Sequence, residues 1–258
     1  MNPYYRGYAV EQMNVGGGGA AQSALSAAIQ GFSPVLHMPL TEGSGTFLDL
    51  SSNAAVGTKD ANVTHASVVG GFGQMYPAFA AGEITIPDLA AYSFAADTGP
   101  KTFIAMVKPT TPSTTQGIIS KWTTTSTNVE WGFALSSSKL FGATYAANGS
   151  LRRYNISGGS SLGAGAWSFA AMVVENGQNG PIQLALNSGT YFGSTTNGPG
   201  GGPADGAGVV RIGNAPIGGG GGSKWTGSIG QVAMFSAALS AVQLGTLYDA
   251  AVADGWFA

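Results

Sequence analysis

Residues 224–248 read KWTGSIGQVAMFSAALSAVQLGTLY, and the hydrophobic pattern changes half-way along this stretch. In the first half, Ile229, Val232 and Phe235 lie among small or polar residues, as in a half-buried strand. In the second half, the apolar residues follow a helical period: Leu239, Val242, Leu244, Leu247 and Tyr248. Ser240 followed by Gln243 is a capping-box pattern at the junction. The stretch therefore predicts a strand that runs into a short closing helix.

This ending resembles the last strand and closing helix of laminin-G-like domains in the concanavalin A-like lectin/glucanase superfamily. Residues 37–51, HMPLTEGSGTFLDLS, resemble the opening strand of that family and its Asp-Ser turn. Further matching pieces follow in the family's order: EITIPDL (83–89), KTFIAMVKP (101–109), GIISKW (117–122), WGFAL (131–135), GAWSFAAMVV (165–174), IQLALNSG (182–189) and VRIGN (210–214). The resemblance covers about residues 35–250 and concerns fold more than function, because this fold carries many activities.

The resemblance implies an all-β fold, in which two antiparallel sheets pack as a concanavalin A-like jelly-roll sandwich. We expect residues 35–258 to form this sandwich, with the C-terminal helix at 240–253. Residues 1–34 are expected to form an extended N-terminal arm with a short helix near 20–30. Two sets of alternating residues are expected to point into the sandwich: Phe103, Ala105 and Val107, and Trp167, Phe169, Ala171 and Val173.

The composition excludes several kinds of function. The 258 residues include no cysteine, which excludes disulfides, thiolate zinc sites and cysteine nucleophiles. The net charge is −2 without a basic stripe, so nucleic-acid binding is not expected, and no run of about 18 apolar residues suggests a membrane span. Charged residues make up 9% of the chain, against about 25% in typical proteins. Such a surface favours a place inside an assembly, although a secreted binding domain would also fit.

The first thirty residues carry candidate docking groups. Tyr4, Tyr5, Arg6 and Tyr8 form a cluster of residue types that often anchor interfaces, and Leu25 and Ile29 would share one face of the short helix. We expect these residues to attach the chain to a partner, with packing onto its own domain as the alternative. Residues 1–12 lack the apolar core of a secretory signal, which suggests another route out of the cell, such as lysis.

The sequence argues against catalysis. Glycosidases of this superfamily place carboxylates at alternate strand positions, but no two carboxylates in the chain lie at i, i+2 or i, i+4 spacing. Glu130, beside Trp131, is the nearest candidate acid, and it would need a partner from another strand. Residues 159–163, GSSLG, match a nucleophile elbow but lead into a loop and then a strand, where the elbow needs a helix. His37 and His65 are expected to be packed or solvated and not to act as bases or zinc ligands. The chain is therefore not expected to be an enzyme.

Two ligand classes remain open. Calcium could use the alternating oxygens of residues 49–53 or Asp205. However, an aspartate that hydrogen-bonds its own turn would account for Asp49 without a metal, so no cofactor is required. A glycan could stack on exposed aromatic rings, for which the candidates are Trp122, Trp131, Tyr145 and Trp225. The alternative for each ring is a place in the core.

Together these features suggest a non-catalytic structural protein of a bacteriophage virion, as a capsid decoration or a fibre or tail component. In this hypothesis residues 1–31 attach to other virion proteins, and the lectin-like domain contacts host-surface glycans. The alternative hypothesis is a carbohydrate-binding module of a bacterial surface or secreted protein, and a glycoside hydrolase ranks below both. A homo-oligomer is compatible with each hypothesis, although no heptad pattern indicates one.

Overall fold

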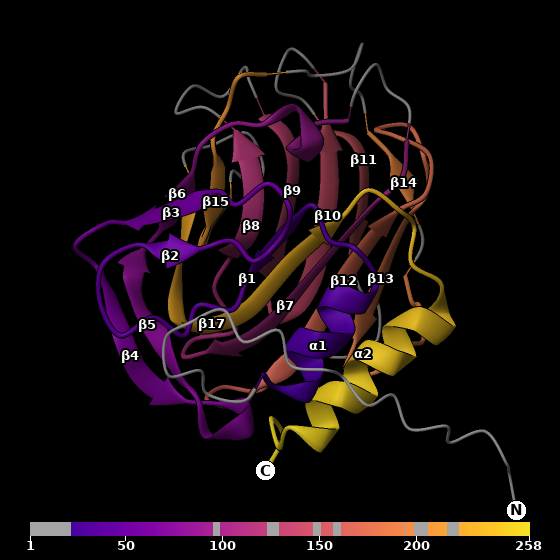
Figure 1. Ribbon diagram of the computed structural model, residues 1–258. Coiled ribbons are helices and arrows are strands. Elements are labelled where there is room, and N and C mark those ends of the chain that lie inside the picture. Colours follow the sequence, from indigo (N-terminus) through magenta and orange to yellow (C-terminus); the bar gives the residue numbers. More distant parts are fainter. Residues whose placement is uncertain are drawn as a thin grey trace, which may run out of the picture.

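The computed structural model describes residues 22–94, 99–122, 129–146, 151–156, 161–193, 195–198, 206–215 and 222–258 (Figure 1). Two antiparallel sheets lie face to face, and helices α1 (Ala24–Gly31) and α2 (Ala241–Ala253) cover the outer face of one of them. We call this the helix-side sheet and the other the outer sheet. The predicted all-β sandwich with a C-terminal helix is confirmed.

The helix-side sheet has the strand order β13-β12-β7-β17-β5-β4, and β1 and β16 also pair with β17. Its strands are β1 Leu36–Met38, β4 Val63–Val69, β5 Met75–Gly82, β7 Lys101–Pro109, β12 Ser168–Val174, β13 Ile182–Leu186, β16 Asn214–Ala215 and β17 Ser223–Phe235.

The outer sheet has the order β14-β11-β10-β9-β8-β15-β6-β3-β2. Its strands are β2 Phe47–Leu48, β3 Val56–Lys59, β6 Ile84–Ile86, β8 Gln116–Trp122, β9 Val129–Ser136, β10 Lys139–Tyr145, β11 Leu151–Ile156, β14 Thr196–Asn197 and β15 Val210–Ile212. Two short 3-10 turns, η1 (Gly71–Gly73) and η2 (Ala90–Tyr92), complete the described elements.

Strands β7 and β12 of the helix-side sheet are buried on both faces, which explains one wrong prediction. Phe103, Ala105 and Val107 face the core between the sheets, as expected. Trp167, Phe169, Ala171 and Val173 instead face α1 and α2, in a second core. Their neighbours Ala170 and Met172 point between the sheets, since Ala170 pairs with Ala105. Both faces of β12 are apolar, so alternation alone could not tell the inner face from the outer one.

Strand β17 contains a bulge that its sequence spacing reflects. Ile229 and Val232 both point into the core between the sheets although they are three residues apart. One extra residue is therefore needed, and the pairing of β17 with β7 shifts between Gly230 and Ala233. Gln231 lies in this bulge with a φ of 48°. After the bulge, Phe235 points toward the helices.

The C-terminal helix begins as the sequence predicts. The Ser240 hydroxyl accepts a hydrogen bond from the Gln243 N–H, and the Gln243 side chain accepts one from the Ser240 N–H at 2.9 Å. This reciprocal capping box satisfies two backbone donors at the junction with β17. Leu244, Leu247 and Ala251 then bury one face of α2 against the sheet.

Helix α1 is part of the packed body. Leu25 and Ile29 are both fully buried in the core that α2 covers, so their predicted role in docking a partner is wrong for this reason. The Asp254 carboxylate accepts hydrogen bonds from the N–H groups of Ala24 and Leu25 at 2.8 and 2.9 Å. The C-terminal end of the chain thus holds the start of α1 in place. The other predicted docking residues, Tyr4, Tyr5, Arg6 and Tyr8, lie outside the described residues.

Candidate functional site

The aromatic residues that were expected to stack on sugars are buried. Trp131 and Trp225 lie fully buried in the core between the sheets, where the Trp131 ring lies 4.4 Å from that of Phe103. Trp122 and Tyr145 are 5% and 1% exposed in a small cluster on the other face of the outer sheet. A sugar stacks on an open ring face, which none of the four rings offers. Their predicted role as glycan ligands is therefore wrong.

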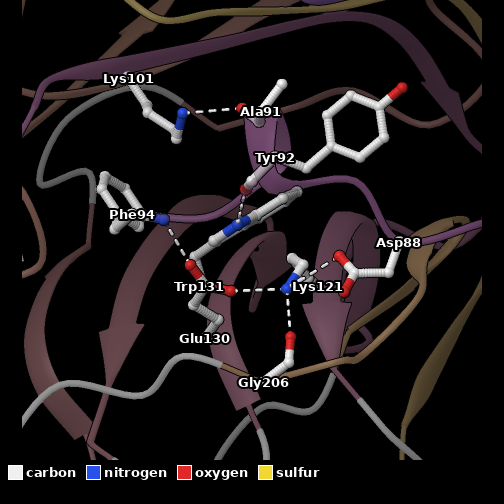
Figure 2. A network of polar contacts seen from close by, with 9 residues as sticks. All are labelled: Asp88, Ala91, Tyr92, Phe94, Lys101, Lys121, Glu130, Trp131 and Gly206. Carbon is white, nitrogen blue, oxygen red and sulfur yellow. Dashed lines mark hydrogen bonds and ion pairs between the residues drawn. The ribbon is translucent and has the colours of Figure 1, made fainter. Parts of the chain in front are cut away.

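A buried charged network lies at one end of the outer sheet (Figure 2). The Lys121 ammonium on β8 contacts Glu130 Oε2 on β9 at 2.8 Å and Asp88 Oδ1 at 3.2 Å, and it donates to the Gly206 carbonyl. Glu130 Oε1 accepts a hydrogen bond from the Phe94 N–H. Lys121 is fully buried and Glu130 is 1% exposed, whereas Asp88 is 34% exposed.

The same end of the sheet holds the segment that contains η2. Trp131 Nε1 donates to the Tyr92 carbonyl at 2.9 Å, and Lys101 Nζ donates to the Ala91 carbonyl at 2.9 Å (Figure 2). Burial lowers the pKa of Lys101 to about 8, against the opposing attraction of Glu130. The network thus fixes a connecting segment with side chains from three strands.

Glu130 has an acidic neighbour from another part of the chain, Asp88. Asp88 and Glu130 contact one ammonium, so two carboxylates do lie close together. However, the Lys121 ammonium lies between them (Figure 2), and Glu130 has no exposed surface from which to reach a substrate. Burial raises the pKa of Glu130, and the opposing attraction of Lys121 only partly offsets this shift. Among the described residues, this pair does not provide the open acid and nucleophile that glycoside hydrolysis needs.

His37 and Asp49 also have structural roles. Gln30 Nε2 lies 2.7 Å from His37 Nδ1, and His37 Nε2 lies 3.1 Å from Gln231 Oε1. Burial lowers the pKa of His37, which agrees with a neutral, packed ring. Asp49 Oδ1 accepts from the N–H groups of His37 and Ser51, both at 2.8 Å, as the turn-former interpretation predicts.

Other candidate ligands do not come together in the described residues. His65 Nδ1 contacts the Glu42 carbonyl at 3.0 Å, and the ring stacks on Phe47. Within the described ranges no group of three His, Cys, Asp or Glu side chains could hold a metal ion. Asp205 lies outside these ranges.

Two hollows open on the surface of the described body. The first, of about 340 Å³, lies between the start of α1, the segment after β1 and the β17 bulge, with Gln22, Thr41, Leu50, Gln74 and Gln231 among its lining residues. We call it the amide groove. The second, of about 440 Å³, is more apolar and lies beside β4, β5, β7 and β17.

A family model described as the concanavalin A-like lectin/glucanases superfamily matches residues 80–245. The chain belongs to this superfamily. Among curated proteins no relative matched the chain. Within the described residues, neither helix combines the length and apolar character needed to cross a membrane.

Solved structures share the fold at low sequence identity. The binding domain of Paraclostridial Mosquitocidal Protein 1 matches with a TM-score of 0.61 and 12% identity, over 84% of this chain and 52% of that one. The Botulinum Neurotoxin DC binding domain in complex with SialylT matches with a TM-score of 0.58 and 13% identity, over 85% and 52%. The same domain in complex with rat synaptotagmin II gives 0.59 and 14%, with the same coverage. The chain thus spans about half the length of these binding domains.

The sequence could not have located the amide groove or the charged network. Gln22, Thr41, Gln74 and Gln231 are spread over 210 positions, and no local motif connects them. For the network, the sequence pointed to Glu130 on β9 as the candidate acid. Its two partners lie on other elements, Lys121 on β8 and Asp88 between β6 and η2. Only the sheet pairing brings these residues together.

Proposed function

We propose that this chain is a non-catalytic, lectin-like binding domain that recognises glycans. The observation that carries the proposal is that Lys121 forms ion pairs with both Asp88 and Glu130. In a superfamily of lectins and glucanases, this leaves the acidic pair of this chain unable to act as acid and nucleophile. Structures of the same fold are binding domains, and one was solved with SialylT. Their likeness supports binding as the general role, with the ligand specific to each protein.

A glycan array tests this proposal. The purified chain is expected to retain a small set of glycans and to leave them chemically intact. Binding to no glycan on the array, or release of new reducing ends during the incubation, would contradict it. Lys121→Met is a useful companion variant, because it removes the blocking charge and still leaves Glu130 buried. It is expected to lose stability and to gain no hydrolytic activity.

A place in a bacteriophage virion is the more specific form of the proposal. The low fraction of charged residues and the cluster of Tyr4, Tyr5, Arg6 and Tyr8 support it, since both suit a chain held in an assembly. Residues 1–21 would be the attached segment, because α1 is occupied within the body. The alternative is a carbohydrate-binding module of a bacterial surface or secreted protein.

Deletion of residues 1–21 distinguishes these two settings. It leaves α1 and its contacts with Asp254 in place, so the domain should fold. In the virion setting the shortened chain is lost from purified particles but still binds its glycan. Normal incorporation into particles would argue against the docking role. Deletion of residues 1–31 is a poor test, because it also removes the buried Leu25 and Ile29.

A further inference from the structure

We propose that the amide groove is the glycan site and that it takes a neutral saccharide of one or two units. This inference rests on the proposed function and names the place and class of the ligand. Gln22, Gln74 and Gln231 line the groove together with hydroxyl residues such as Thr41. Carboxamides both donate and accept hydrogen bonds, which matches the paired donor and acceptor character of sugar hydroxyls.

The charge of the lining selects the class of ligand. None of the described residues that line the groove is an Asp, Glu, Lys or Arg. Three carboxylates close to the lining in sequence or structure are acceptors of backbone N–H groups: Glu42 of the Leu48 N–H, Asp49 of the turn donors and Asp254 of the donors at the start of α1. A sialylated or phosphorylated ligand would bring a charge that this lining cannot pair. A neutral saccharide brings none.

The groove also offers both polar and apolar contacts. Within the described part of the chain, the Gln74 carboxamide and the Thr41 hydroxyl have no hydrogen-bond partner, and both residues are partly exposed. Leu50 is 49% exposed and, with Pro39, gives the groove an apolar wall. Such a wall suits the C–H face of a pyranose. A volume of about 340 Å³ lies at the small end of the range for ligand sites.

Hydrogen bonds hold two of the lining residues, Gln22 and Gln231, in place. Gln231 sits in the β17 bulge, where its side chain contacts His37 at 3.1 Å and its N–H donates to the Pro39 carbonyl at 3.2 Å. On the opposite side, Gln22 Nε2 donates to the Ser26 hydroxyl at 3.2 Å. Gln231 is only 2% exposed and thus forms a fixed floor of the groove. A preformed site loses less conformational entropy on binding than a flexible one.

Matched substitutions test the inference. The probes are maltose, cellobiose, lactose, chitobiose and sialyllactose, titrated calorimetrically. Gln74→Ala and Thr41→Ala are each expected to weaken binding of a neutral disaccharide about fivefold, the effect of one hydrogen bond. Leu50→Trp should fill the groove and weaken binding more than tenfold. Leu48→Trp is its control, because Leu48 is 50% exposed on the same segment and does not line the groove.

The outcomes separate this inference from the proposed function. If the wild type binds a neutral disaccharide and only the groove variants lose it, the inference holds. If binding survives in Gln74→Ala and Leu50→Trp, or if only sialyllactose binds, the groove is not the site, while glycan recognition stands. If neither these probes nor an array glycan binds, both proposals fail. Circular dichroism of each variant shows that a loss of binding is not a loss of fold.

Discussion

Glu130→Gln should destabilise the domain strongly, because it leaves a buried cation with too little countercharge. In the wild type, the fully buried Lys121 ammonium contacts Glu130 at 2.8 Å and the partly exposed Asp88 at 3.2 Å. The glutamine can keep the hydrogen bond from the Phe94 N–H, but its other end can point an N–H₂ group at the ammonium. Removing one partner of a buried ion pair costs about 3–5 kcal/mol. Because Asp88 still supplies one countercharge, the loss should be about 3 kcal/mol.

Urea unfolding and calorimetry measure this loss. For a domain of this size, about 3 kcal/mol corresponds to a fall in Tm of about 6–12 °C. Asp88→Asn is the control and should cost less than about 1 kcal/mol, because Asp88 is partly exposed. The double variant Lys121→Met/Glu130→Gln should recover part of the loss, giving a favourable coupling energy between the two sites. A Glu130→Gln protein more stable than wild type would refute this reasoning, since carboxylates held at the expense of stability are typical of active sites.

Three further predictions follow from single contacts. Lys101→Met should raise stability at pH 7 by about 1–2 kcal/mol. The fall of the Lys101 pKa from 10.5 to about 8 means that keeping this buried group charged costs at most about 3 kcal/mol. The variant avoids this cost but loses the lysine's hydrogen bonds, which reduces the gain. The advantage should shrink as pH rises from 8 to 10.5, because in this window the folded lysine has lost its proton while the unfolded lysine still carries one, so that the wild type gains stability with pH. An unchanged difference across pH 8–10.5, measured by urea unfolding, would be the contrary result. Asp254→Asn should weaken the hold on α1 by about 1 kcal/mol, seen as faster hydrogen exchange at Leu25 with β7 unaffected. Gly117→Ala should destabilise the domain, because its Cβ would meet the Ala215 backbone nitrogen at 2.0 Å; wild-type stability would show that β16 can move away.

The closing strand and helix could be predicted because their signals are local. The Ser240–Gln243 capping box and the apolar face of α2 depend on neighbours within a few positions. The strand was predicted from Ile229 and Val232, whereas the bulge between them is shown by the pairing of β17 with β7. Such a local pattern predicts the structure well because the residues that form the pattern also contact one another in the folded chain.

Predictions that depended on long-range packing failed for a physical reason. The sequence pattern around an aromatic residue in a strand does not show whether its ring faces a core or the solvent. The burial of Trp131 and Trp225 could therefore not be predicted from the sequence. The face of Trp167 depended on the two helices that cover the sheet, and Leu25 and Ile29 looked unpartnered until α2 was placed beside them. The amide groove depends on four segments far apart in sequence.

Native mass spectrometry of the intact chain with neutral oligosaccharides tests the central claim most directly, because it reports binding and cleavage in one spectrum. The account predicts one oligosaccharide of unchanged mass per chain, released whole when the complex is dissociated. A spectrum with shortened sugar products, or with the protein bare at every oligosaccharide concentration, would contradict it.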